Sequence, residues 1–320
     1  MKKIAILTSG GDAPGMNACV RACVRYAIYN GFEVYGVERG YVGLINDKLF
    51  LMNKRSVSDI IHRGGTILKT ARCLEFKDIE YQKKAANILR SHGIENLIVI
   101  GGDGSFRGAR DLSVNCGINV VCIPATIDND LAYTDYTLGF DTAVNTVLSA
   151  INNLRDTMTS HDRVSLVEVM GRKCGDLALY ATIGGGVEHC LVPEIPVDVK
   201  AICDAIKKSQ SEGKTSNMII MAEGVENKEQ IIATIQQETG ISIKITHLGH
   251  TQRGGSPSMA DRLLAAKFGV RAVDLLINGQ TNRTVGIVNN QIIDKDIIEA
   301  VSMKKQIDAK LHNIAQIISL

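Results

Sequence analysis

The feature that most constrains the fold is an alternation along the 320 residues: short β-branched apolar runs take turns with longer segments of helical spacing. The runs are IAILTS, EVYGVE, NLIVIGG, NVVCIPA, VSLVEVM, MIIMAEG and IKITHLG. Continuously apolar strands are buried on both faces, and strands that alternate with helices pair in parallel. The sequence therefore predicts an α/β protein of three-layer domains with mainly parallel sheets.

Apolar residues recur at helical spacing in 16–30, 81–93, 141–157, 198–213 and 260–279. The length suits about two domains, and a boundary is expected near the long helix that begins at about Gly139. In sheets of this kind ligands bind outside the carboxyl ends of the strands. The residues that follow each strand are therefore the first candidates for a site.

Composition excludes several classes of protein. Hydrophobic residues make up 45% and charged residues 22% of the chain, which is typical of a folded globular protein. A net charge of +2 argues against a general nucleic-acid or anionic-membrane surface. The eight cysteines form no C-x-x-C pair, and no apolar stretch is long enough for an export signal or a membrane span. We expect a reduced cytoplasmic protein that binds neither nucleic acid nor membrane.

Glycine-rich loops follow two of the predicted strands. Gly10 and Gly11 follow the first, and Gly101, Gly102 and Gly104 follow NLIVI. Glycine lets the backbone approach a ligand closely, and the N-terminus of a following helix offers unpaired N–H groups, so both loops suit phosphates. One such loop alone would more often be a tight turn. Two of them, each between a strand and a helix, favour a phosphate site.

Asp103 lies inside the second glycine loop, where a carboxylate would repel a phosphate unless a cation lay between them. This position predicts Mg²⁺ that bridges Asp103 and a polyphosphate. A dinucleotide fingerprint fits worse, because the spacing G-x-G-x-x-x-G is one residue too long. The segment EGKTS at 212–216 copies the tail of a P-loop without its first glycine or strand, and we interpret it as a helix end and loop.

The segment PATIDND places two carboxylates directly after the strand NVVCI. The run DNDLAYTDY, which begins at Asp128, lacks the glycine and the terminal glutamate of an EF-hand loop. Asp128 or Asp130 could instead accept a proton from a substrate hydroxyl, which beside a metal-bound polyphosphate indicates phosphoryl transfer to an alcohol. The competing interpretation, that both acids cap a turn, is the better one for this segment alone but not beside two glycine loops.

Cationic residues follow other strands and are candidate phosphate clamps, because arginine makes bidentate contacts with phosphate. They are Arg172 in VMGRKCGD, and His250 with Arg253 in LGHTQRGGSP. Arg21 and Arg25 are spaced to share one face of the first helix. A solvated surface is the ordinary interpretation of each of these residues taken singly.

Taken in order, TSGGDAPGMN, RGGT, ARC, IGGDGS, TIDND, VEVMGR and GHTQRGGSP resemble the bacterial form of the ATP-dependent 6-phosphofructokinase family, over about Ile4 to Met303. The resemblance implies a homotetramer, two α/β domains and an active site in the cleft between them. It implies an ATP-binding domain at 1–138 plus 251–301 and a fructose-6-phosphate-binding domain at 139–250 plus 302–320.

The resemblance also implies roles for individual residues. ATP would be bound by Gly11, Arg72, Cys73, Gly102, Asp103, Gly104 and Ser105, with Asp103 on Mg²⁺. Asp128 would take the proton from the sugar 1-hydroxyl beside Thr126, and Arg172 would stabilise the transferred phosphoryl group. Fructose 6-phosphate would contact Thr126, Ile127, Asp128, Asp130, Met170, Gly171, Arg172, Glu223, His250, Thr251, Gln252 and Arg253, together with Arg163 and Lys244 of a neighbouring subunit.

An effector site for ADP as activator or phosphoenolpyruvate as inhibitor is implied as well. It maps to Arg21, Ala22, Cys23, Val24, Arg25, Lys54, Arg155, Gly186, Val187, Glu188, Glu212, Lys214, Thr215 and Ser216. Three positions depart from the family pattern: Lys244 and Lys54 replace arginine, and Glu212 stands where a cation is common. We expect weaker or less strict substrate binding from Lys244, and altered effector binding from Lys54 and Glu212.

Two alternatives remain at this point. Pyrophosphate-dependent relatives typically carry aspartate after the metal-binding aspartate and lysine before the threonine of TIDND, whereas this chain has Gly104 and Ala125. Both residues favour ATP. A non-catalytic nucleotide-binding regulator would explain the glycine loops but gives no reason for Asp128, Arg172 or Arg253.

Overall fold

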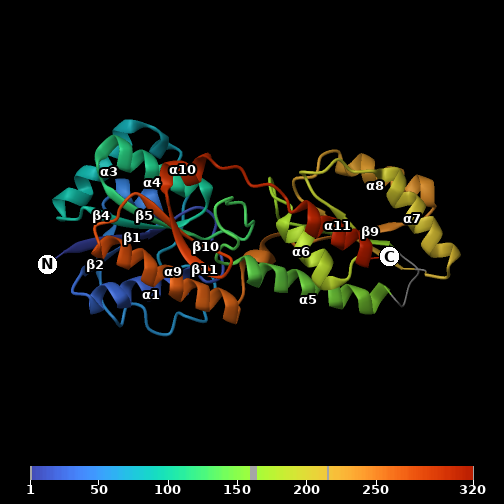
Figure 1. Ribbon diagram of the computed structural model, residues 1–320, viewed down its shortest axis with the longest axis horizontal. Helices are drawn as coiled ribbons and strands as arrows, with labels where there is room; N and C mark the ends of the chain where they lie inside the picture. Colours follow the sequence, from blue (N-terminus) through green and yellow to red (C-terminus); the bar gives the residue numbers. More distant parts are fainter. Residues whose placement is uncertain (1, 159–163, 215, 320) are drawn as a thin grey trace. The chain divides into compact units, whose positions relative to one another are not determined.

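The computed structural model describes residues 2–158, 164–214 and 216–319 and forms two compact units. Unit 1 comprises 1–142 with 253–305, and unit 2 comprises 143–252 with 306–320. Each unit holds one sheet (Figure 1). The predicted α/β class with mainly parallel sheets is confirmed. None of the helices in the described ranges is long and apolar enough to span a membrane.

Unit 1 contains a seven-stranded sheet of order β11-β10-β5-β4-β1-β2-β3. Its pairs are parallel except β2 with β3 and β10 with β11 at the two edges. The strands are β1 Lys3–Thr8, β2 Glu33–Val37, β3 Leu49–Met52, β4 Asn96–Gly101, β5 Asn119–Pro124, β10 Arg283–Val288 and β11 Gln291–Asp296. The helices are α1 Met16–Tyr29, α2 Gly40–Ile45, α3 Ile79–Ser91, α4 Asp103–Cys116, α9 Met259–Ile277 and α10 Ile297–Ser302.

The core of unit 1 lies on both faces of its sheet. After their first residue, β1, β4 and β5 are buried throughout, as expected of strands covered on both sides. On one face α3, α4 and α10 pack through Leu89, Phe106 and Val301 onto strand residues such as Leu7 and Val99. Helices α1 and α9 lie together on the other side (Figure 1). The covering helices leave the ends of the strands as the accessible part of the sheet.

Unit 2 contains a four-stranded sheet of order β7-β8-β6-β9, in which every pair is parallel. Its strands are β6 Val164–Val169, β7 His189–Leu191, β8 Asn217–Ala222 and β9 Ile243–His247. Helices α6 Asp176–Gly185, α7 Val199–Ser211, α8 Lys228–Thr239 and α11 Ala309–Ile318 belong to it, and α5 Phe140–Met158 runs from unit 1 into unit 2. Helix α7 contacts α8, and α6 contacts α11.

All seven predicted strands and all five predicted helical segments are present. The predicted set lacks β3, β7 and β11, which lie at sheet edges, and β10, which pairs with β11. The β10–β11 hairpin did carry a signal, because Asn289 and Asn290 both adopt positive φ, at 50° and 62°, as a two-residue primed turn requires. Five of the eight cysteines are buried and pack as small hydrophobes.

A buried carboxylate joins the start of α9 to the start of α5. Asp261 is 1% exposed, and it accepts hydrogen bonds from the backbone N–H of Gly139 at 2.8 Å and of Thr142 at 2.9 Å. The Thr142 hydroxyl donates to the same carboxylate. Burial raises the pKa of Asp261, while these donors lower it. The contacts fix the point at which the chain leaves unit 1.

We expect Asp261→Ala to lower the free energy of unfolding by about 3 kcal/mol, because three buried donors lose their acceptor. The matched control is Asp78→Ala, which removes an exposed N-cap from α3 and should cost about 1 kcal/mol. Urea midpoints of the two variants check this. Equal midpoints would show that Asp261 acts only as another helix cap.

Candidate active site

The carboxyl ends of three neighbouring parallel strands bring the two glycine loops and PATIDND to one sheet edge. Strands β1, β4 and β5 end at Thr8, Gly101 and Pro124, and β4 lies between the other two. The loop after β1 is fixed to β4, because the Ser9 N–H donates to the Ile100 carbonyl at 3.0 Å. The glycine loops and PATIDND therefore share one edge, as the strand pattern predicted.

The second glycine loop opens α4. Gly102 is the N-cap in extended conformation, and Asp103 is the first helical residue. A side chain at Gly101 would come within 2.5 Å of the Ser9 carbonyl and 2.6 Å of Ser105 Oγ, so only glycine fits there. The buried hydroxyl of Tyr41 donates a hydrogen bond to the Ser105 carbonyl at 2.6 Å and so fixes the loop. The N-terminus of a 14-residue helix is thus presented at the edge, where it favours anions.

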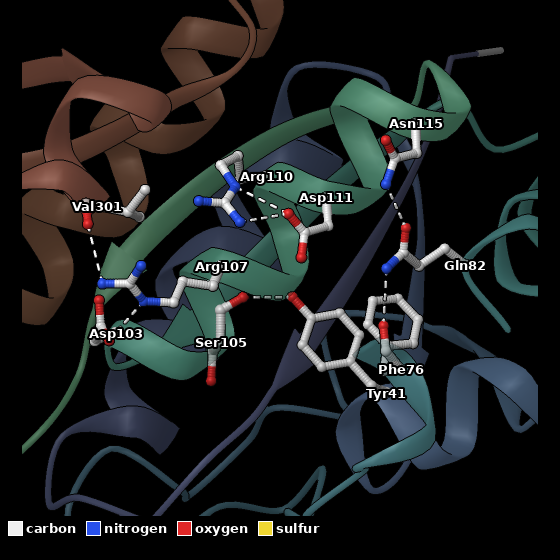
Figure 2. A network of polar contacts seen from close by, with 10 residues as sticks. All are labelled: Tyr41, Phe76, Gln82, Asp103, Ser105, Arg107, Arg110, Asp111, Asn115 and Val301. Atoms are coloured by element: carbon white, nitrogen blue, oxygen red, sulfur yellow. Dashed lines mark hydrogen bonds and ion pairs between the residues drawn. The ribbon is translucent and has the colours of Figure 1, made fainter. Parts of the chain in front are cut away.

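Asp103 is paired with a residue that the sequence reasoning missed. Arg107, one turn along α4, donates from Nε to Asp103 Oδ2 at 2.9 Å (Figure 2). The same guanidinium donates from Nη2 to the Val301 carbonyl at 3.0 Å. The four-residue spacing of an acid and a base on one predicted helix was the signal available in the sequence.

The PATIDND loop is built around a buried asparagine. Asn129 is fully buried at a φ of 51°, and its side-chain amide donates to the Asp135 carbonyl at 3.0 Å. Thr126 Oγ1 accepts from the Asp128 N–H at 3.2 Å, and its carbonyl accepts from the Thr137 hydroxyl at 2.6 Å. The Ile127 side chain lies in the core. The two carboxylates thus flank a fixed residue in a left-handed turn.

Asp130 is mostly buried, and its Oδ1 has no hydrogen-bond partner within the described residues. Burial, and then the charge of Asp128, raise its pKa from 3.8 to about 6, and the charge of Asp103 adds to this. Lys305 acts in the opposite direction. The carboxylates of Asp103, Asp128 and Asp130 therefore lie close enough to influence one another.

Arg253 meets the first glycine loop. Its Nη1 donates to the Asp12 carbonyl at 3.1 Å, and a side chain at Gly11 would lie 2.4 Å from the same nitrogen. A side chain at Gly11 would therefore require the guanidinium of Arg253 to move. The structure brings these two predicted site residues together. Arg72 is exposed, and half-buried Cys73 lies against the core cluster under α3 and α4.

The second set of predicted residues follows the strands of unit 2. Buried Gln252 accepts from the Met170 N–H at 3.1 Å and so ties the segment after β9 to the end of β6. Gly171 has a φ of 128°, and its carbonyl accepts from the Gly224 N–H at 3.1 Å. Arg172 is 75% exposed, with Nε 3.9 Å from Glu223 Oε1. These residues share the carboxyl-end edge of the four-stranded sheet.

Glu168 is a second residue that the sequence reasoning missed. Its carboxylate accepts from Lys228 Nζ at 2.7 Å and lies 3.2 Å from His247 Nδ1. Burial acts against its ionisation, but Lys228 and His247 together lower its pKa. Lys228 opens α8 after Glu223, and His247 ends β9 before His250 and Thr251, both of which are exposed. Glu168 therefore connects the two segments that carry predicted sugar-binding residues.

The predicted effector residues fall into local groups. In unit 2 the Arg155 guanidinium donates to the Gly186 carbonyl, and Glu188 accepts from Lys214 Nζ at 2.7 Å and from the Met218 N–H at 2.9 Å. Exposed Glu212 follows α7 as its C-cap, with its carboxylate 3.9 Å from Lys208 Nζ. The described residues of EGKTS, 212–214 and 216, form a helix end and loop as expected. Val187 is buried, Ser216 is half-buried, and the predictions for Thr215 and Arg163 lie outside the described residues.

In unit 1, Arg21 and Arg25 both lie on α1 and are partly exposed. Cys23 and Val24 between them are fully buried, and Ala22 is half-buried against Gly269 of α9. The two arginines are therefore the part of this segment that can meet an anion. Lys54 is exposed just after β3, and Lys244 is exposed on β9, an edge strand of its sheet.

The carboxylates at the unit 1 edge suit Mg²⁺ by their chemistry. Within the described ranges, no group of three or more histidine, cysteine, aspartate or glutamate side chains could hold a metal ion by itself. Mg²⁺ usually binds through one or two carboxylates together with substrate phosphates and waters, so a full protein cage is not required. Half-exposed Asp103 at a helix N-terminus and the unpartnered Oδ1 of Asp130 meet that requirement.

Two α/β units whose strand ends carry glycine loops, carboxylates and arginines define a phosphotransferase of the phosphofructokinase class. The family model for phosphofructokinase matches residues 3–276. The chain belongs to this family, and within it to the ATP-dependent 6-phosphofructokinases.

Curated relatives match over their full lengths. The ATP-dependent 6-phosphofructokinases of Clostridium botulinum (strain Alaska E43 / Type E3) and Clostridium novyi (strain NT) are each 58% identical to it, over 100% of both chains. ATP-dependent 6-phosphofructokinase 1 of Clostridium perfringens (strain 13 / Type A) is 56% identical over the same share. The resemblance inferred from the motifs is confirmed.

Solved structures support the fold. Phosphofructokinase from Saccharomyces cerevisiae matches with a TM-score of 0.88 and 34% identity, over 100% of this chain and 48% of its own. A pyrophosphate-dependent phosphofructokinase from Marinobacter aquaeolei matches with a TM-score of 0.84 at 21% identity, over 97% of this chain and 86% of its own. At that identity the second likeness shows the fold alone.

The raised pKa of Asp130 gives a stability prediction. The folded state disfavours the charged carboxylate, so stability falls as the pH rises from 3.8 through about 6. We expect Asp130→Asn to raise the free energy of unfolding by up to about 3 kcal/mol at pH 8, and to have no such effect at pH 4.

Urea midpoints in EDTA at both pH values measure this difference. The control is Asp308→Asn, at the exposed N-cap of α11, where asparagine caps as well as aspartate. If the free energy of unfolding at pH 8 rises no more in Asp130→Asn than in the control, burial of the charged Asp130 carboxylate does not destabilise the folded state as we expect.

Proposed function

We propose that this chain transfers the γ-phosphoryl group of ATP to the 1-hydroxyl of fructose 6-phosphate, giving fructose 1,6-bisphosphate and ADP in cytoplasmic glycolysis. The observation that carries the proposal is the edge of the unit 1 sheet, where two glycine loops lie beside Asp103, Asp128 and Asp130. Anion-binding loops, a metal-type carboxylate and a separate base are the parts that this chemistry needs.

Each part has a distinct role in the proposed reaction. Asp128 accepts the proton as the sugar oxygen forms its bond to the γ-phosphorus, and the bond from that phosphorus to the bridging oxygen breaks to release ADP. The N–H groups that open α4 bind the phosphates. Asp103, with Asp130 nearby, would hold Mg²⁺, which neutralises charge on the phosphates.

The residues of unit 2 hold the sugar phosphate in this proposal. Arg172 is the residue assigned to the charge on the transferred phosphoryl group, and its large exposure leaves the guanidinium available to an anion. Glu223, His250 and the Met170–Gly171 backbone are assigned to the sugar. The hydrogen bond of Gln252 to Met170 supports this assignment, because it ties the two segments together.

The choice of ATP as phosphoryl donor is supported at Gly104. A Cβ built there would meet no described atom within 4 Å, so the backbone offers open space at the helix N-terminus. Ala125 is buried and provides no cation that could replace nucleotide phosphates. A coupled assay with fructose 6-phosphate and either ATP or pyrophosphate tests this. Turnover with pyrophosphate alone, or with neither, would overturn the proposal.

We expect Asp128→Asn to lower kcat by ~10²–10⁴-fold with little change in KM, because the proton acceptor acts mainly in the transition state. Asp135→Asn is the matched control. Asp135 lies in the same loop region, but its carboxylate accepts a hydrogen bond from the backbone N–H of Asn289 and has no assigned role in proton transfer. Steady-state kinetics of both variants measure the effect. Near-normal kcat in Asp128→Asn would remove it as the base.

Lys244 gives a prediction for substrate affinity. We propose that it contacts the 6-phosphate of fructose 6-phosphate bound to a neighbouring subunit of a homotetramer. Arginine at this exposed position of β9 would add a bidentate fork, and we expect Lys244→Arg to lower KM for fructose 6-phosphate several-fold. Lys207→Arg, on α7, is the control. An unchanged KM in Lys244→Arg would contradict this role.

We propose that ADP or phosphoenolpyruvate binds as an effector near the Arg155–Gly186 and Glu188–Lys214 contacts. Lys214 is already paired with Glu188 in this structure, so an anionic effector would have to compete with that carboxylate. Glu212, at the end of α7, adds a further negative charge. Both features favour weaker binding of anions than a wholly cationic site would give.

A further inference from the structure

Arg107 is held at two points beside the carboxylate assigned to the metal. Its Nε lies 2.9 Å from Asp103 Oδ2 and its Nη2 lies 3.0 Å from the carbonyl of Val301, near the end of α10 (Figure 2). Val301 is 5% exposed and belongs to the core cluster. The second contact distinguishes this pair from an ordinary surface pair along a helix, whose long side chains are free to separate.

The charges around Asp103 explain why a fixed cation matters there. Asp103 raises the pKa of Asp130, as Asp128 does, so the carboxylates repel one another at this edge. A divalent cation would be attracted to such a group of charges even without a nucleotide. The guanidinium of Arg107 occupies one Asp103 oxygen and repels a dication from it.

We propose that Arg107 is a resident counter-ion of Asp103, which excludes a free divalent cation and admits it together with a nucleoside polyphosphate. The proposal rests on the assignment of Asp103 to the metal in the proposed function. The phosphates carry enough negative charge to offset the guanidinium, so the metal-nucleotide complex binds where the bare ion does not. The enzyme thereby avoids a tightly held metal that would have to leave before each metal-nucleotide complex could bind.

The next arginine of α4 provides a matched control. Arg110 is bound to the neighbouring Asp111 through Nε at 2.9 Å and Nη2 at 2.6 Å (Figure 2). It has the same charge as Arg107 and lies on the same helix, but it is paired with a different acid. A general effect of net charge on metal binding would be the same for both arginines.

The experiment measures binding of Mn²⁺ alone to the full chain by the loss of the free-ion electron paramagnetic resonance signal, and then repeats it with ADP. We expect Arg107→Met to tighten binding of free Mn²⁺ about tenfold, Arg107→Lys to change it little, and Arg110→Met to leave it unchanged. With ADP present, the difference in Mn²⁺ affinity between Arg107→Met and the wild type should become smaller. Unchanged or weaker Mn²⁺ binding in Arg107→Met, or equal tightening in Arg110→Met, overturns the proposal.

Two further variants keep the outcomes separate. Arg107→Gln retains a donor for the Val301 carbonyl without the charge, so it should also tighten Mn²⁺ binding and serves if the methionine variant does not fold. Asp103→Asn combined with Arg107→Met should lose the gained affinity. If tight binding persists in that double variant, Asp103 is not the ligand and the metal assignment in the proposed function fails. If Mn²⁺ binding is weakened by Asp103→Asn but is unchanged by substitution of Arg107, only the counter-ion proposal fails.

Discussion

The structure depends on one constraint: parallel strands buried on both faces can present polar groups only at their ends. In unit 1 the strands β1, β4 and β5 leave no room for a charge along their length, and in unit 2 the same holds for β8. Because neighbouring strands are parallel, the carboxyl ends of β1, β4 and β5 lie at one edge of the unit 1 sheet, and those of β6 and β8 lie at one edge of the unit 2 sheet. In each unit, polar residues from distant parts of the chain are therefore gathered at one edge of the sheet.

This constraint explains what the sequence could predict. Strand ends are visible as changes from apolar to glycine or acid, so Gly11, Asp103, Asp128 and Arg172 could be found as candidates before any contact was known. The fold class followed from the same pattern. The edge strands β3 and β11 were missed, because a strand with one exposed face or few residues lacks a continuous apolar run.

The supporting contacts were outside the reach of pattern reasoning, because each joins residues that are remote in sequence. Asp261 meets Gly139, Glu168 meets Lys228 and His247, and Arg107 meets Val301. In each case, the way in which helices and strands pack together determines which partner the polar side chain meets. The close approach of Arg253 to Gly11 is of the same kind, and it gives a glycine that was expected to serve a ligand a close neighbour within the protein as well.

The order of strands in unit 1 has a consequence for the growing polypeptide. Strand β5 is complete at Pro124, but its outer neighbour β10 begins at Arg283, after all of 143–252 has been made. During synthesis from the N-terminus, one side of β5 therefore offers unpaired backbone groups while the middle of the chain emerges. Unit 2 lacks only α11 at that stage, so its sheet can form before the sheet of unit 1 is closed on that side.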